Sequence, residues 1–188
     1  MRIFIKRPWV IPGTTRFPEF NYGFADSFLV SLRFAFLVAR RKLSKYLEET
    51  HILAGIYLAH WEKIKRYWRM PEENEKLVAG LCGVSRPRSF FETRYREKYD
   101  ADNAPRAGPA PDFWTYSETA AKILDSAVEI AQSRAALTLG PPTIVTPEDF
   151  LLAAAQCADL VLSRRLVASG LDVQELEIAV RAPLTDHK

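Results

Sequence analysis

The sequence predicts an all-α protein, a helical bundle built from two diverged copies of one repeat and preceded by an extended N-terminal arm. Three observations support this prediction. Apolar residues recur at spacings of three and four over most of the chain, which is the period of an amphipathic helix. Capping residues, prolines and glycines stand where these periodic segments begin and end. The second half of the chain repeats the pattern of the first, so the halves are expected to pack with pseudo-twofold symmetry.

Length and composition fit one globular domain. The 188 residues are 48% apolar and 12% aromatic, which is enough for a substantial core. Basic residues outnumber acidic ones by 26 to 23, an excess too small to indicate nucleic-acid binding by itself. Cys82 and Cys157 lie in apolar surroundings without metal-ligand spacing, which favours a reducing compartment, although one disulfide bond would be feasible. We expect a soluble, cytoplasmic protein, because no signal-peptide pattern and no membrane-length apolar stretch stands in the sequence.

Residues 1–23 are predicted to form the extended arm. Apolar residues alternate there with prolines and other breakers, and the arm is expected to lie across the helical body. The same stretch would allow one short strand, but a single strand has no partner with which to pair. The first helix is expected over 26–43, because Phe28, Leu32 and Ala35 fall on one face.

Two further helices are expected in the first half of the chain. One begins near Glu48, where acidic residues suit the positive end of a helix, and continues through the basic segment 63–68. Pro71 ends it, and the next helix stops at Gly83. Residues 84–114 then change character, because their prolines, aspartates and glycine are typical of a linker and cannot hold a long helix.

The second half has clear helix boundaries. Ser117 can cap a long helix, and Thr146 is followed by a proline and two acids, a pattern typical of a helix start. Gly170 is expected to stop the next helix in a left-handed conformation. Asp172 and Glu175 have the spacing of a capping box for a final helix. No alternating strand pattern competes with these helices.

The internal repeat is clearest in the small residues. Ala35 and Ala39 correspond to Ala127 and Ala131, 92 positions further on, and alanines four apart let helices approach closely. After an insertion, residues 47–54 correspond to 145–152. The predicted organisation is therefore an arm (1–23), a first repeat (24–83), a Pro-rich linker (84–114), a second repeat (115–182) that forms one compact domain with the first, and a tail (183–188).

This pattern resembles the Clp repeat domain, the N-terminal module of Clp-family AAA+ unfoldases. The family pattern has a helix with A-xxx-A, a loop, and then T-E-H-L-L-L-A-L. The first copy here reads A-F-L-V-A-R-R and later E-E-T-H-I-L-A-G; the second reads V-T-P-E-D-F-L-L-A and later S-G-L-D-V. The resemblance implies a mobile module that binds adaptors and unfolding substrates, in some members by holding phosphorylated arginine through the motif glutamate.

Carried over by position, the motif glutamate is Glu148 in the second copy and Thr50 in the first, where Glu49 is adjacent. The motif histidine is kept as His51 and is replaced by Asp149 in the second copy. The resemblance therefore implies one binding site, around Glu148, rather than two. The candidates for contact with a peptide or adaptor are Glu148, Ser117, Thr50 and Glu49.

A basic segment with interleaved aromatic residues follows the second predicted helix start. Such a segment can hold phosphates and stack on bases, or contact an acidic protein. The alternative is an amphipathic helix that buries Trp61, Ile64 and Trp68 and leaves a solvated basic face. If a partner binds here, its candidate contacts are Lys63, Lys65, Arg66, Arg69 and Trp68.

Nothing in the sequence indicates catalysis, a metal or a cofactor. No G-xxxx-GK-[ST] phosphate loop occurs, so the parts of an ATPase are absent. His51 and His60 are nine residues apart and would face opposite sides of a helix, which is unsuited to a shared metal. We expect a non-catalytic adaptor or accessory factor that contacts a Clp-type unfoldase, an adaptor or a substrate peptide. A basic helical protein that binds nucleic acid is the alternative, and no membrane partner is expected.

Overall fold

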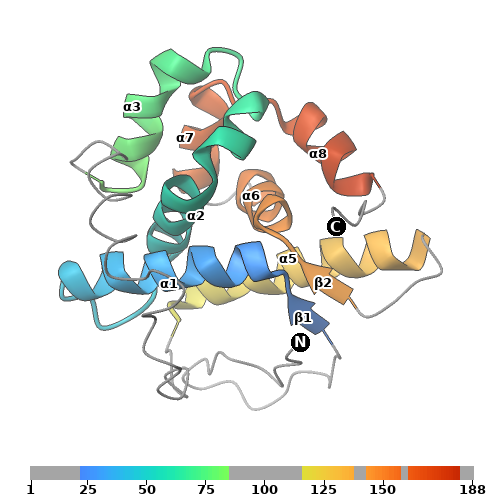
Figure 1. Ribbon diagram of the computed structural model, residues 1–188, viewed down its shortest axis with the longest axis horizontal. Helices are drawn as coiled ribbons and strands as arrows, with labels where there is room; N and C mark the ends of the chain where they lie inside the picture. The colour runs from blue at the N-terminus through green and yellow to red at the C-terminus, as the bar shows by residue number, and fades with distance from the viewer. Residues whose placement is uncertain (1–21, 85–115, 138–142, 158–160, 183–188) are drawn as a thin grey trace, which may run out of the picture.

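The chain folds into short and medium helices with one small pair of parallel strands (Figure 1). The computed structural model describes residues 22–84, 116–137, 143–157 and 161–182. Most of the predicted arm and linker, and the tail, lie outside these residues. In chain order the elements are β1 (Tyr22–Phe24), α1 (Asp26–Arg41), α2 (Glu49–Ile64), the 3-10 helix η1 (Lys65–Tyr67), α3 (Pro71–Leu81), α5 (Glu118–Leu137), β2 (Thr143–Val145), α6 (Pro147–Gln156), α7 (Val161–Ala168) and α8 (Val173–Arg181). No helix among the described residues has both the length and the apolar character needed to cross a membrane.

The helix ends follow local chemistry. The Ser117 hydroxyl accepts a hydrogen bond from the Ala120 amide at 3.1 Å, and Thr146 accepts one from Asp149 at 3.3 Å, so both predicted caps are confirmed. Gly170 has a φ of +86°, as the predicted left-handed stop requires. The first helix ends at Arg41, two residues earlier than predicted, because Leu43 has a φ of +55° and leaves the helical conformation.

The prediction that a strand near the arm would lack a partner was wrong. Residues 22–24 form β1 and pair in parallel with β2, in the register Tyr22 to Thr143 and Phe24 to Val145. Its partner, β2 (Thr143–Val145), lies between two predicted helices of the second half, where the sequence has no alternating strand pattern. Strands of three residues are too short to show an alternating pattern, and they exist here only through long-range pairing.

Two backbone pairings recur at positions related by the sequence repeat. The Ala25 amide donates to the Val145 carbonyl at 2.9 Å, and the Ser117 amide donates to the Leu47 carbonyl at 3.0 Å. Ser117 lies 92 positions after Ala25, and Val145 lies 98 positions after Leu47. The start of each half is therefore paired with the middle of the other half. A third, antiparallel bridge joins Trp68 to Leu171, from opposite halves.

The core lies between the two long helices, α1 and α5, and the helices α2 and α6 that cross them (Figure 1). The crossing of α1 and α2 is close enough to exclude a side chain at Gly55. A β-carbon there would lie 2.1 Å from the Ser31 carbonyl oxygen and 2.8 Å from the Ala35 nitrogen. Ala35 and Ala39 are fully or almost fully buried at this crossing, as the spacing of small residues predicted.

Candidate functional site

The N-terminus of α6 carries the acid that the sequence singled out. Thr146 caps the helix, Pro147 is its first residue and Glu148 its second, so the carboxylate lies where the helix dipole favours negative charge. The Glu148 side chain is only 9% exposed, and its Oε1 is 2.6 Å from the Nζ of Lys63, whose side chain is 55% exposed. The candidate binding acid is therefore paired with a residue of the candidate basic patch.

Arg66 and Tyr67 lie beside this ion pair. The Arg66 guanidinium donates a hydrogen bond to the Tyr67 hydroxyl and lies over its ring, 4.7 Å from the centroid. This hydrogen bond, with smaller contributions from Glu148 and Glu175, raises the pKa of Arg66. Burial raises the pKa of the Tyr67 hydroxyl, so both groups keep their protons at neutral pH.

Glu49 and Ser117 are brought together elsewhere, at the start of α2. The Ser117 hydroxyl is 3.4 Å from Glu49 Oε2, and its principal role is to cap α5. Thr50 is half-buried next to Glu49 on α2. The residues predicted to contact one partner therefore lie in two places, one at the start of α2 and the other at the start of α6.

Several residues of the basic segment, residues 61–69, make contacts within the chain. Trp68 is 2% exposed and donates its indole N–H to the Ser169 hydroxyl at 3.0 Å. Trp61 and Ile64 are buried as well, so the burial expected of the amphipathic alternative is confirmed. The α-helix, however, ends at Ile64 rather than continuing through residue 68, because residues 65–67 form a 3-10 turn and Trp68 is extended. Lys65 pairs with Glu62 at 2.7 Å, whereas Arg69 is exposed. Trp68 is therefore a core residue and is not presented to a partner.

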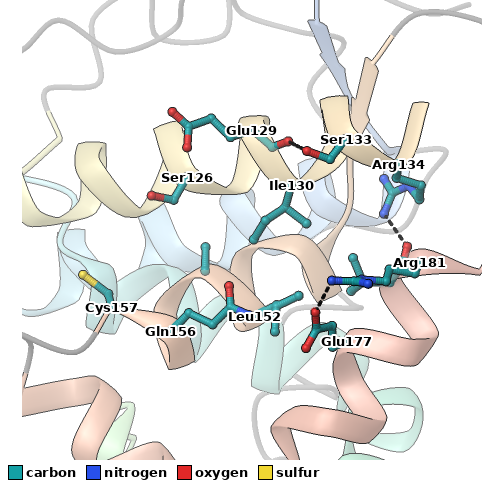
Figure 2. Close-up of a pocket in the computed structure, with 12 residues that line it drawn as sticks. Ser126, Glu129, Ile130, Ser133, Arg134, Leu152, Gln156, Cys157, Glu177 and Arg181 are labelled. Atoms are coloured by element: carbon teal, nitrogen blue, oxygen red, sulfur yellow. Dashed lines mark hydrogen bonds and ion pairs between the residues drawn. The ribbon is translucent and has the colours of Figure 1, made fainter. Parts of the chain in front are cut away.

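A groove of about 490 Å³ opens between α5, α6 and α8 (Figure 2). Apolar side chains form part of its lining: Ile130 points from α5 toward α6, and Leu152 and Ala153 of α6 also line the groove. Polar and charged side chains stand along it, among them Glu129 and Ser133 from α5, Gln156 and Cys157 from the end of α6, and Glu177 and Arg181 from α8. An apolar centre with polar edges suits a peptide or one protruding side chain.

One end of the groove is built on a buried ion pair. Arg134 is 5% exposed, and its two terminal nitrogens donate to the two Asp149 carboxylate oxygens at 2.6 Å and 2.9 Å. The same guanidinium donates to the Ile144 carbonyl at 2.7 Å. It also lies 3.4 Å from the Val180 carbonyl oxygen (Figure 2). Burial raises the pKa of the Asp149 carboxyl, and the guanidinium acts against that shift. Arg134 thereby fixes β2, α6 and α8 relative to α5.

The first half uses other residues at the equivalent positions. His51 stands where the second half has Asp149, and Lys42 stands where it has Arg134. The His51 Nδ1 accepts a hydrogen bond from the Glu48 amide at 3.1 Å and so helps to cap α2. Burial lowers the pKa of His51; Glu48 opposes this shift, and Lys42 adds to it. The two halves therefore share capping geometry, but only the second holds a buried ion pair at this place.

The groove was missed from the sequence, although one signal pointed to it. Arg134 lies three residues after Ala131, on the apolar face of the predicted helix. A cation on a buried face requires a carboxylate partner, and Asp149 was available at the next helix start. Ala153 on α6 is the residue that corresponds to Gly55 on α2. A β-carbon is excluded at Gly55 by α1, whereas Ala153 has one and lines the groove.

No protein-family model fits the chain, and no curated protein is significantly similar to it. Within the described residues, no group of three or more His, Cys, Asp or Glu side chains is arranged to hold a metal. The two cysteines are free thiols, Cys82 buried and Cys157 at the groove.

Proposed function

We propose that this chain is a non-catalytic protein-binding module, a double repeat of the Clp type. It acts as an adaptor or accessory factor for a Clp-type unfoldase–protease system, for another adaptor or for its substrates, in the cytoplasm. The observation that carries this proposal is the recurrence of the Ala25–Val145 hydrogen bond as Ser117–Leu47. The donors of the two bonds are displaced by 92 positions and the acceptors by 98, and the same displacements relate the two copies of the sequence repeat. Equivalent bonds at equivalent positions are expected of a duplicated unit.

The groove along α5, α6 and α8 is the surface that we assign to the partner. Its apolar residues can receive an aliphatic or aromatic side chain, and its edges offer hydroxyl, amide and carboxylate groups for a peptide backbone. The ion pair of Arg134 with Asp149 keeps the walls of the groove in place before a ligand arrives. A preorganised surface of this kind reduces the entropy lost on binding.

A pull-down from the native host tests the proposal. The full chain is expected to retain a Clp-type unfoldase, an adaptor or a protein under degradation, and to show no ATP turnover. Ser133→Trp should weaken retention, because it places a large ring at the groove from an exposed position. Arg33→Trp, an equally exposed change on α1, is the matched control. Retention of no Clp component, or equal retention by both variants, would argue against the proposal.

Nucleic-acid binding stays the alternative prediction and has weaker support. Lys63 and Lys65 are already paired with Glu148 and Glu62, and the aromatic residue nearest to Arg69 is buried. Stacking on bases needs an accessible ring. Salt-dependent retention on DNA or RNA, lost on charge reversal of Lys63, Lys65 and Arg66, would favour this alternative; no retention at low salt would exclude it.

A further inference from the structure

Large apolar side chains are exposed on two adjacent helices, α3 and α7. Met70, at the start of α3, is 55% exposed and Leu77 is 57% exposed. On α7, Val161 is 70% exposed and Val167 is 50% exposed. Among the described residues, these four are most of the large apolar side chains that are at least half exposed. They are concentrated on α3 and α7, which are short helices. Single exposed apolar residues are ordinary, but a group on neighbouring helices indicates a contact surface.

The two helices are held together as one surface. The Arg69 amide, just before α3, donates to the carbonyl of Gly170, just after α7, at 3.3 Å. Trp68 and Leu171 form the antiparallel bridge beside this bond. Both helices lie away from the β1–β2 pair, at the other end of the molecule (Figure 1). A partner that touches one of them can therefore reach the other.

The exposed charges on the two helices are opposite in sign. α3 presents Glu72 and Glu73, and α7 presents Arg164 and Arg165. None of these four side chains forms an ion pair within the part of the chain that the structure describes. α3 also carries Lys76, but acids predominate on it. The surface thus combines apolar side chains with one acidic helix and one basic helix.

We propose that this α3–α7 surface is the interface of a two-fold symmetric homodimer, in which α3 of each protomer lies on α7 of the other. In a two-fold symmetric contact, the same surface patch of both protomers forms the interface. If α3 of one protomer contacts α7 of its partner, then α7 of the first protomer also contacts α3 of the partner. That arrangement pairs Glu72 and Glu73 with Arg164 and Arg165 twice, and it covers Leu77 and Val167. An acidic or a basic partner protein would match only one of the two helices. The inference is independent of the groove and of the proposed function.

Sedimentation velocity of the full chain across a wide concentration range tests this proposal. The wild type is expected to form a reversible dimer that weakens as salt is added. E72R/E73R makes both helices basic, and R164E/R165E makes both acidic, so each variant alone should dissociate at least about tenfold more readily. R33E/R40E, which reverses two exposed charges on α1, should leave the dimer unchanged.

Mixing the two interface variants provides the sharper result. In a heterodimer of E72R/E73R with R164E/R165E, both helix contacts again join opposite charges. The mixture should therefore dimerise more tightly than either variant does alone. Circular dichroism shows whether each variant is folded, and Leu77→Ser with Val167→Ser tests the apolar contact if a charge variant does not fold. A wild type that is monomeric at every concentration, or a mixture that stays monomeric when both variants are folded, would overturn the proposal.

Discussion

Lys63 Nζ lies 2.6 Å from Glu148 Oε1, so the acid expected to bind a partner is already paired with a cation from the other half of the chain. Glu148 is almost buried at the N-terminus of α6, whereas Lys63 approaches it from the end of α2 and stays half exposed. A cationic ligand at Glu148 must therefore displace Lys63.

Lys63→Met should lower the free energy of unfolding by about 1 kcal/mol. The loss is modest because Lys63 is half exposed and the helix N-terminus still stabilises the Glu148 carboxylate. Lys65→Met is the matched control: it breaks an exposed pair with Glu62 and should cost about 0.5 kcal/mol or less. Urea titrations measure both. Equal losses of stability in the two variants would show that the burial of Glu148 does not strengthen its ion pair with Lys63.

Arg134→Met should be far more damaging, with a loss of about 3–5 kcal/mol, because it removes the cationic partner of the buried Asp149 carboxylate and the guanidinium donor of the Ile144 carbonyl. Arg181→Met removes an exposed pair with Glu177 and should cost about 0.5 kcal/mol or less. Chemical denaturation compares them. If Asp149→Leu is added to Arg134→Met, part of the loss should be recovered, since no buried charge then remains, although the Thr146 amide loses its acceptor. A single-variant loss below about 1 kcal/mol would contradict the role assigned to this pair.

Gly55→Ala should destabilise the fold by about 2–4 kcal/mol or more, because the new β-carbon overlaps the backbone of α1. Gly80→Ala is the same change in a helix with no atom within 4 Å of the new β-carbon. It should stabilise the protein by about 0.4–1 kcal/mol through helix propensity and a less flexible unfolded chain. Thermal unfolding distinguishes the two signs. Tolerance of Gly55→Ala would mean that α1 and α2 separate easily.

Local features of the structure could be predicted from the sequence. The caps at Ser117 and Thr146 and the stop at Gly170 depend on residues within one turn, so the residue types themselves indicate them. Helical periodicity likewise placed the start of α1 at Asp26. The recurrence of two alanines four apart predicted a close approach between helices, and the packing of Ala35 at Gly55 confirms it for α1 and α2.

The features that the sequence did not reveal all depend on distant partners. The pairing of β1 with β2 joins segments more than a hundred residues apart and has no local pattern. The contact of Lys63 with Glu148 depends on how α2 packs on α6, and the groove depends on the position of α8. Periodicity assigns residues to a face of a helix, but it does not say which other helix that face meets.

His51 should make stability depend on pH in the mildly acidic range. Burial lowers its pKa in the folded state below the unfolded value of 6.5, so the unfolded chain binds the proton more readily. Stability is then complete above about pH 6.5 and is lost as the pH falls below it, because a protonated Nδ1 can no longer accept the Glu48 amide. Glu48 and Lys42, the charged neighbours of the ring, act in opposite directions.

His51→Gln tests this dependence, because glutamine at the third helical position can accept the same amide without titrating. Urea titrations from about pH 7.5 to about pH 5.5 should show a smaller loss of stability in the variant than in the wild type. His60 and His187 are present in both proteins, so the difference between the two curves belongs to His51. Parallel curves would mean that the ring is equally accessible to protons in the folded and unfolded states, and that its bond to Glu48 contributes nothing to the start of α2.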